Sequence, residues 1–280
     1  MLESSASMVK SAIAPQHHDN SLNVLPPPLK WAGGKRWQLP HLKEYWEREC
    51  HRRLVEPFCG GLAVTLGLTP QRALLNDINP HLINFYLWLK RGLNISIKMR
   101  TNHAHFYKRR KRFNELLRTG KAATKEAASL FYYLNRTGYN GMCRFNGSGE
   151  FNVPIGSYQK VKYKRDFSAY KALFTNWQFS NRSFQYVELE PGDFVYADPP
   201  YDVEFTHYWK KGFSWEDQVR TAQWLATHRG PVILSNIATL QIVRLYKGLG
   251  YEIIRRSAPR RISCNGDRRD VKEVLAIRNL

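Results

Sequence analysis

The sequence has few cysteines, few acidic residues and no long apolar run, and each shortage argues against a class of protein. Its four cysteines, with no pair at metal-ligand spacing, argue against a zinc site or a disulfide framework. No apolar run approaches the ~18 residues of a membrane span. Residues 1–23 lack the apolar centre of a secretion signal. We therefore expect free thiols in a reducing cytoplasm, no metal and no membrane.

The shortage of acidic residues leaves the chain strongly basic. Lys and Arg number 43 and Asp and Glu 23, so the formal net charge at pH 7 is +20. Such an excess repels itself in a compact fold, and a polyanionic partner would relieve the repulsion. Nucleic acid is the leading candidate, because Lys and Arg that neutralise phosphates release condensed counterions. A membrane surface is the alternative, but no basic helix with a clean apolar face supports it.

Short apolar segments alternate with helix-like ones along much of the chain. With 43% hydrophobic residues in 280, the chain can build one substantial core. Strands are expected near residues 54–58, 73–77, 193–198 and 231–236, with helices between them, one opening near Pro80. This alternation predicts an α/β fold with a mostly parallel sheet covered on both faces. Residues 251–256 and 272–277 are candidates for an antiparallel edge.

Residues 92–166 break this pattern and are expected to form an inserted module. They hold a basic run at residues 108–112 within a helix-like pattern, then an aromatic stretch rich in Asn and Gly. The basic run suits phosphate contacts, although a solvated helix face explains it almost as well. We therefore predict a disordered, dispensable tail at residues 1–24, a scaffold at residues 25–91 and 167–280, and the module between its two parts.

Two strand ends suit a nucleotide-like ligand. In open α/β sheets the ligand lies outside the carboxyl ends of the strands. Gly60 and Gly61 follow one strand and allow a ligand close to the backbone, and Asp77 at the end of the next can accept both ribose hydroxyls. The same residues also suit an ordinary turn and a helix cap.

The tetrapeptide Asp198-Pro199-Pro200-Tyr201 ends another apolar strand. Two prolines remove two backbone donors and stiffen the chain, so the Asp198 carboxylate and the intervening carbonyl become fixed acceptors. An exocyclic amine on a base needs two such acceptors before it attacks a sulfonium methyl. Tyr201 offers an aromatic plane on which a base removed from its duplex can stack.

These features occur among seven segments that resemble, in the same order, those of the Dam family of DNA adenine-N6 methyltransferases, the D12 class of the alpha group of amino-methyltransferases. The resemblance covers about residues 29–280. The segments are Leu29-Lys30-Trp31-Ala32-Gly33-Gly34-Lys35, Glu56-Pro57-Phe58-Cys59-Gly60-Gly61, Asn76-Asp77-Ile78-Asn79, Leu134-Asn135-Arg136-Thr137-Gly138-Tyr139-Asn140-Gly141, Gly149-Glu150-Phe151-Asn152-Val153-Pro154, Asp198-Pro199-Pro200-Tyr201 and Arg261-Ile262-Ser263-Cys264-Asn265-Gly266.

The resemblance implies a Rossmann-like S-adenosylmethionine-dependent methyltransferase sheet, with a mainly helical target-recognition domain that carries a β-hairpin at residues 92–166. It also implies S-adenosylmethionine as cofactor and double-stranded DNA as substrate. The expected location is the cytoplasm, at the nucleoid, or the cytoplasm of a host cell if a phage encodes the chain. The implied cofactor residues are Trp31, Ala32, Gly33, Lys35, Phe58, Gly60, Asp77 and Asp198. One departure is Leu62, which stands where the family often has a glycine and is expected to narrow the turn without abolishing binding.

The resemblance further implies which residues meet DNA. Tyr139 and Asn140 match residues that enter the duplex near the evicted adenine, although Tyr139 also suits an ordinary core position. Arg144 matches the arginine that reads a guanine, in a hairpin that suits the major groove, and its alternative is a phosphate contact. The whole implied set is Lys30, Arg136, Tyr139, Asn140, Met142, Arg144, Asn152, Pro154 and Tyr158.

Together these matches predict methylation of a flipped adenine within GATC, catalysed by residues Asp198, Pro199, Pro200 and Tyr201. Two alternatives remain at this stage. A methyltransferase acting on cytosine N4 or on RNA would use the same pair of acceptors, and a catalytically silent DNA-binding protein could keep the fold. Four arginines, at positions 260, 261, 268 and 269, suggest a basic hairpin near the end, facing phosphate or solvent. Protein partners are not predicted.

Overall fold

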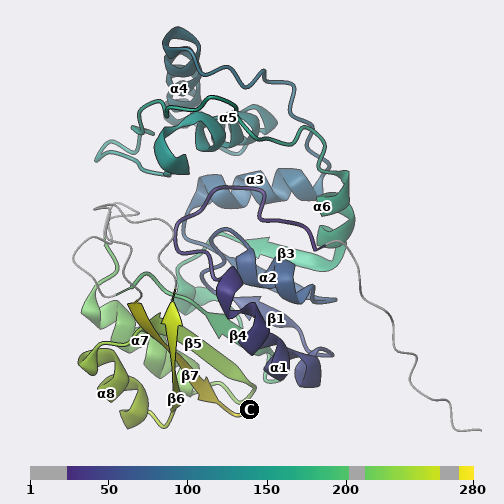
Figure 1. Ribbon diagram of the computed structural model, residues 1–280. Helices are drawn as coiled ribbons and strands as arrows, with labels where there is room; N and C mark the ends of the chain where they lie inside the picture. The colour runs from purple at the N-terminus through teal and green to yellow at the C-terminus, as the bar shows by residue number, and fades with distance from the viewer. Residues whose placement is uncertain (1–23, 202–211, 259–270) are drawn as a thin grey trace, which may run out of the picture.

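The computed structural model describes residues 24–201, 212–258 and 271–280 (Figure 1). The predicted tail, apart from Val24, and the predicted basic hairpin of residues 260–269 lie outside the described residues. The elements follow in the order η1 (Arg36–Gln38), α1 (Leu39–Glu49), β1 (Leu54–Glu56), α2 (Ala63–Leu68), β2 (Ala73–Asn76), α3 (Pro80–Lys90), α4 (His103–Arg118), α5 (Lys125–Thr137), η2 (Tyr139–Gly141), α6 (Ser168–Leu173), η3 (Phe174–Asn176), β3 (Trp177–Ser180), η4 (Phe184–Tyr186), β4 (Phe194–Ala197), α7 (Trp215–Ala226), β5 (Val232–Ile237), α8 (Leu240–Gly248), β6 (Glu252–Ala258) and β7 (Val271–Arg278).

The strands within the described ranges form one seven-stranded sheet in the order β3-β2-β1-β4-β5-β7-β6. The strands from β3 to β5 are parallel, and β7 runs antiparallel between β5 and β6. The predicted α/β class, the parallel scaffold and the antiparallel pairing are confirmed. The sequence analysis missed β3, whose residues Trp177-Gln178-Phe179-Ser180 contain no aliphatic run, and it did not foresee that β7 separates β5 from β6.

Both faces of the central strands are buried, which explains their nearly continuous apolar sequences. Successive side chains of a strand point to opposite faces. Leu54 and Tyr196 belong to a core shared with α1, α2 and α3, whereas Val55 and Val195 belong to a second core shared with α7 and α8. The carboxyl ends of β1, β2 and β4 therefore meet at one edge of a sheet that helices hold on both sides.

Helices α4 and α5 lie beyond α3, on the side away from the sheet (Figure 1). Their first turns are capped by the side chains of Asn102 and Thr124, which accept backbone N–H groups. Phe85 of α3 stacks on Tyr132 of α5 with ring centroids 5.6 Å apart. The core beneath α3 thus continues into the helices that the sequence assigned to the inserted module, whose bounds at residues 92 and 166 stay a prediction.

The expected hairpin is present after α5. Asn146 donates its backbone N–H to the carbonyl of Glu150 at 2.9 Å, and Asn152 donates to that of Arg144 at 3.1 Å. The turn between the two arms ends on Gly149, whose positive φ of 77° suits glycine. A mainly helical module with a β-hairpin is therefore confirmed.

Three further findings concern the described residues alone. None of their helices combines the length and the apolar character that crossing a bilayer demands. They contain no group of three or more His, Cys, Asp or Glu side chains that could hold a metal ion. Cys50, Cys59 and Cys143 are free thiols, and Cys264 lies outside the described ranges.

Candidate active site

The carboxyl ends of β1 and β2 bring Gly60 and Asp77 together, as the sequence predicts. The backbone N–H of Gly60 donates to Asp77 Oδ2 at 3.1 Å, and that of Asn79 donates to Asp77 Oδ1 at 2.9 Å. Burial raises the pKa of the Asp77 carboxyl to about 6, against the lowering effect of these two donors. Ile78, the next residue, keeps 49% of its surface exposed. A carboxylate beside an exposed apolar side chain suits a ribose and the base attached to it.

The glycines after β1 are required by close packing against Trp31. A Cβ atom built on Gly60 would lie 2.9 Å from Trp31 Nε1, and one built on Gly61 would lie 2.8 Å from Trp31 Cβ. The hydroxyl of Tyr86 in α3 donates to the Gly60 carbonyl at 2.6 Å. Trp31 therefore fixes the predicted cofactor segment over the β1 turn.

The other predicted cofactor residues lie around this turn. Ala32 and Gly33 are exposed, and Gly33 has a φ of 78°. Phe58 is half-buried, with ring centroids 5.5 Å from Phe184 and 5.7 Å from Phe213. The structure thus brings together the loop before η1, the β1 turn and the end of β2.

Leu62 is placed differently from the expectation that it narrows the turn. Its backbone is left-handed, with φ 60° and ψ 27°, and its side chain is fully buried in the core beneath α1 and α2. A glycine would adopt this backbone without strain, but the leucine side chain gains burial instead. The departure from the family pattern therefore affects the core and not the open side of the turn.

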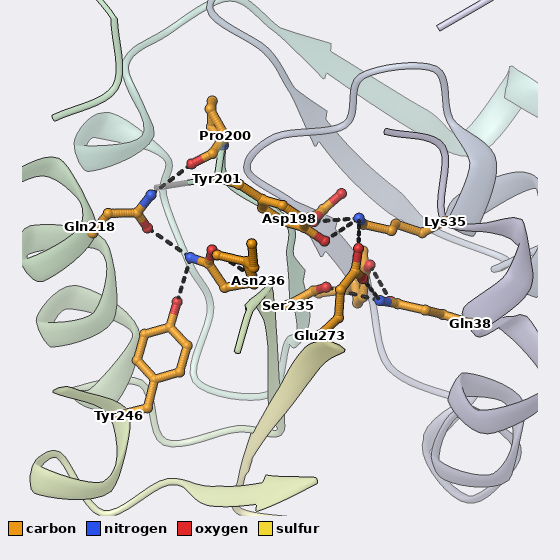
Figure 2. A network of polar contacts seen from close by, with 12 residues as sticks. Lys35, Gln38, Asp198, Pro200, Tyr201, Gln218, Ser235, Asn236, Tyr246 and Glu273 are labelled. Carbon is orange, nitrogen blue, oxygen red and sulfur yellow. Dashed lines mark hydrogen bonds and ion pairs between the residues drawn. The ribbon is translucent and has the colours of Figure 1, made fainter. Parts of the chain in front are cut away.

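Asp198 follows β4 and lies against the buried ammonium of Lys35, as Figure 2 shows. Lys35 Nζ is 3.6 Å from Asp198 Oδ1 and also hydrogen-bonds the Tyr201 hydroxyl. Asp198 Oδ1 is a buried atom without a hydrogen-bond partner among the described residues. Burial raises the pKa of the Asp198 carboxyl to about 7, and the Lys35 charge opposes that rise. Within the described residues this oxygen therefore faces the Lys35 charge but has no partner at hydrogen-bond distance, and it keeps capacity to accept a donor.

Two polar residues that the sequence analysis missed hold Lys35 in place (Figure 2). Glu273 of β7 accepts from Lys35 Nζ at 3.1 Å and from Gln38 Nε2 at 2.9 Å. Gln38 also donates to Ser235 Oγ at 3.0 Å and accepts from the Tyr196 hydroxyl at 2.8 Å. Lys35 and Glu273 are only 5% and 6% exposed, so both charges depend on this network.

A second network holds Pro200 from the opposite side (Figure 2). Gln218 of α7 donates to the Pro200 carbonyl at 2.7 Å, and Asn236 of β5 donates to Gln218 Oε1 at 2.9 Å and to the Tyr246 hydroxyl at 3.0 Å. Pro199 is buried beside it. The prolines alone do not fix the tetrapeptide, because three further elements position it.

One signal in the sequence could have revealed these residues. Ser235 and Asn236 end an otherwise apolar strand, and Glu273 interrupts another. Polar side chains that are buried in a sheet need partners, so their presence at a carboxyl end indicates a site. Glu56, at the end of β1, fits the same pattern: it accepts from Thr65, and burial raises its pKa to about 8.

The residues predicted to enter DNA begin in the 3-10 turn η2. Tyr139 is 51% exposed, so it is not an ordinary core residue. Asn140 is exposed and has a φ of 50°. The Tyr139 N–H donates to the carbonyl of Pro154 at 2.9 Å, and Pro154 is itself exposed. The structure therefore presents this turn and the segment at Pro154 together.

Lys30 and Tyr158 adjoin the same turn. The Lys30 ammonium lies 3.9 Å from the centroid of the Tyr158 ring, and the Tyr158 hydroxyl donates to the Gly138 carbonyl at 2.7 Å. Arg136 Nε donates to the carbonyl of Lys162 at 2.8 Å, so its guanidinium is already engaged with the backbone. The side chains of Lys30 and Tyr158 form one unit, and Arg136 lies beside it.

Arg144 and Asn152 lie opposite each other on the two arms of the hairpin. Arg144 is exposed, and its Nε donates to Asn152 Oδ1 at 2.8 Å. Met142, just before the hairpin, packs against the core. This hydrogen bond uses one donor of the guanidinium and leaves its terminal nitrogens available.

Comparisons with known proteins show the family to which the chain belongs. The family described as D12 class N6 adenine-specific DNA methyltransferase matches residues 31–262. A DNA adenine methylase of Vibrio cholerae is 36% identical over 270 residues, which cover 89% of this chain and 94% of that protein. The retron Ec67 DNA adenine methylase of Escherichia coli is 33% identical over 266 residues, covering 89% and 90%.

Similarity to solved structures is weaker. The tRNA (m1A58) methyltransferase TrmI of Aquifex aeolicus has a TM-score of 0.34 and 10% identity, over 86% of this chain and 68% of that one, and at this level nothing is inferred from it. The family match and the two relatives are enough to assign the chain to a family. The chain belongs to the D12 class of N6 adenine-specific DNA methyltransferases, and it is an enzyme of that class.

Proposed function

We propose that the enzyme transfers a methyl group from S-adenosylmethionine to N6 of an adenine flipped out of duplex DNA, within the sequence GATC. The observation that carries this proposal is the Asp198 carboxylate at the end of β4, the strand beside β1. Its buried Oδ1 faces the Lys35 ammonium at 3.6 Å but has no partner within hydrogen-bond distance among the described residues. An exocyclic amine is a donor of the kind that this acceptor requires.

The residues around the β1 and β2 ends fit the cofactor. Asp77 keeps acceptor capacity beyond its two backbone donors, Ile78 offers an apolar surface, and Trp31 closes the β1 turn. On this proposal Trp31, Ala32, Gly33, Lys35, Phe58, Gly60 and Asp77 hold the cofactor, with Asp198 between it and the target amine. The cofactor supplies an electrophilic sulfonium methyl when it is bound.

The catalytic tetrapeptide acts by holding the amine. Asp198 and the carbonyl of Pro199 accept the two N–H groups, which withdraws the nitrogen lone pair from the ring and directs it at the methyl carbon. The nitrogen would gain the methyl as the sulfur–carbon bond of the sulfonium breaks and a neutral thioether leaves, and it would lose one proton, which the Asp198 carboxylate is placed to take. Tyr201 provides the stacking plane. Lys35 balances the negative charge of Asp198 while the amine is bound.

DNA recognition is assigned to several side chains, each with its own part of the target. Lys30 and Tyr158 handle the first base pair, and Arg144 reads the guanine opposite the last cytosine. Met142 and Pro154 contact the neighbouring thymine, Tyr139 and Asn140 enter the duplex near the evicted adenine, and Asn152 orients Arg144. Arg136 braces the segment at Lys162. An arginine fork matches the O6 and N7 acceptors of guanine in the major groove.

The test is transfer of labelled methyl into duplexes that carry GATC or one substituted base pair. We expect Arg144→Ala to cost about 1–3 kcal/mol at GATC and to relax the choice of the outer pair far more than that of the others. The control is Arg118→Ala, which removes an exposed arginine paired with Glu150. A uniform drop for Arg144→Ala would make it a phosphate contact, and indifference of the wild type to GATC would overturn the target.

A further inference from the structure

Two asparagines, one on each helix of the inserted module, bracket the backbone of a distant residue. Asn135 of α5 accepts the N–H of Lys30 at 2.9 Å and donates to the carbonyl of the same residue at 2.8 Å. Asn114 of α4 accepts the N–H of Phe151 at 2.9 Å and donates to its carbonyl at 3.1 Å. Each amide thus copies the pairing of a neighbouring strand for a single residue.

The bonds of Asn135 join two chain segments. A third bond, from Asn135 Nδ2 to the carbonyl of Gly141, is 3.0 Å long. The side chain is 1% exposed, so water cannot replace these partners easily. A Cβ atom on Gly141, whose φ is 67°, would overlap the Lys30 side chain. Asn135 therefore fixes Lys30 directly against the end of the η2 turn.

The Lys30 ammonium has two defined contacts. It lies over the Tyr158 ring and 3.5 Å from the carbonyl of Arg136. Because the Lys30 backbone is held at both its N–H and its carbonyl, a shift of that backbone would move the ammonium away from the ring. The position of Lys30 thus depends on Asn135. Among the described residues, Asn135 forms no hydrogen bond with the Lys30 ammonium or with the Tyr158 hydroxyl.

Asn114 acts on the hairpin in the corresponding way. Phe151 pairs with Phe145 across the hairpin, and its neighbour Asn152 carries the acceptor for Arg144 Nε. Phe151 is 2% exposed and packs on Phe113 with ring centroids 6.1 Å apart. Asn114 therefore fixes the hairpin arm that orients Arg144, and it has no bond to the Lys30 segment among the described contacts.

We propose that Asn135 and Asn114 are positioning residues that set specificity at opposite ends of the DNA target, Asn135 through Lys30 and Asn114 through the hairpin that carries Arg144. This inference rests on the proposed function, because it needs Lys30 and Arg144 to read the first and the last base pair. It adds that two residues that do not themselves contact bases control the recognition of the first and the last base pair independently. They do so because each holds a different DNA-contacting segment against a different helix.

The experiment uses the full chain and a duplex whose second strand already carries N6-methyladenine, so that one adenine accepts and the first and last pairs are defined. Rates are measured as kcat/KM on GATC and on duplexes with the first or the last pair substituted. Asn135→Asp and Asn114→Asp are matched variants: each adds one negative charge, keeps the acceptor oxygen and removes the donor nitrogen. Asn135→Ser and Asn114→Ser are the uncharged counterparts.

Asn135→Asp is expected to lower discrimination at the first pair about tenfold and to leave discrimination at the last pair as in the wild type, and Asn114→Asp is expected to do the reverse. If both discriminations fall together in each variant, or neither falls while the melting temperature does, the two asparagines only stabilise the fold and the inference is wrong. Should Asn135→Asp fail to fold, Asn135→Ser and both Asn114 variants decide by the same criterion. A wild type indifferent to both pairs would instead overturn the proposed target.

Discussion

At the scale of single residues, the proposed mechanism assigns the chemistry to the Asp198 carboxylate, a role that can be tested separately from DNA binding. Asp198→Ala is expected to reduce methyl transfer by at least about 10²–10³-fold, because the amine loses an acceptor that acts as charge develops on nitrogen. Duplex affinity is expected to persist, since it comes mostly from distributed phosphate contacts. Transfer assays and a binding titration measure the two quantities. Glu188→Gln removes an exposed carboxylate and serves as the control. Turnover near that of the wild type in Asp198→Ala would contradict the mechanism.

The ionisation of Asp198 predicts how activity depends on pH. Burial raises the pKa of this carboxyl to about 7, a value to which the nearby Glu273 charge contributes and which the Lys35 charge opposes. On the proposed mechanism the ionised form accepts the amine, so transfer should fall as the pH drops below about 7. Glu273→Gln removes a like charge, so the acidic limb of the kcat/KM profile should move to lower pH.

A matched variant separates this electrostatic effect from packing. Ser235→Ala changes the same network at Gln38 without changing its charge, and its acidic limb should stay where the wild type has it. Equal displacements of the limb in Glu273→Gln and Ser235→Ala, or none in either, would mean that the Glu273 charge does not act on Asp198.

At the scale of elements, the turn between β1 and α2 makes a prediction about stability. Leu62→Gly restores the glycine common in the family and relieves a left-handed backbone, a gain of about 1 kcal/mol, but it removes a fully buried leucine side chain, a loss of about 2–5 kcal/mol. We expect the variant to be less stable by about 1–4 kcal/mol in denaturant unfolding, with little change in cofactor affinity.

Thr69 at the other end of α2 is the matched control for that turn. It is also left-handed, with a φ of 46°, but its side chain is exposed. Thr69→Gly therefore loses no buried surface and should stabilise the fold by up to about 1 kcal/mol. If Leu62→Gly also stabilised the protein, backbone strain would outweigh burial at position 62.

Much of the arrangement of elements follows from local patterns. The apolar segments before Gly60, Asp77 and Asp198 become the parallel strands β1, β2 and β4, and their carboxyl ends meet as expected. Burial on both faces of a strand leaves a direct mark on its sequence. The strand β3 leaves no such mark, because at an edge of the sheet only Trp177 of its four residues is fully buried.

At the scale of the whole molecule, the net charge of +20 predicts a steep dependence of DNA binding on salt. For about six phosphate contacts, log K should fall with log salt at a slope of about −5. In the structure the side chains of the basic run at residues 108–112 differ in whether they are paired or exposed. Arg112 is paired with Glu115 and Glu126, whereas Lys108 and Lys111 are exposed. Arg110 donates to the carbonyl of Val153, so we expect the two exposed lysines to meet phosphate.

The double variant Lys108→Ala with Lys111→Ala should reduce the steepness of that slope by about 2, one for each lost contact. Lys43→Ala with Arg48→Ala removes the same charge from exposed positions on α1, far from α4 in Figure 1, and should leave the slope as it is. Binding titrations at several salt concentrations measure both. Equal slopes for the two double variants would make the run on α4 a solvated helix face.

The α/β class, the order of the main elements, the basic character and the motifs at the strand ends could all be predicted from the amino-acid sequence, because each depends on composition or on the periodicity of burial within a few residues. Which polar groups meet depends instead on how distant elements pack. Lys35 and Glu273 are 238 positions apart, and Lys30 and Asn135 are 105 apart. Such pairs depend on the insertion of β7 beside β5 and on the packing of α5 against α3, and no local pattern records either. The carboxylate proposed as catalytic could thus be read from its motif, whereas the residues that hold it in place, and those that hold Lys30, came from the fold.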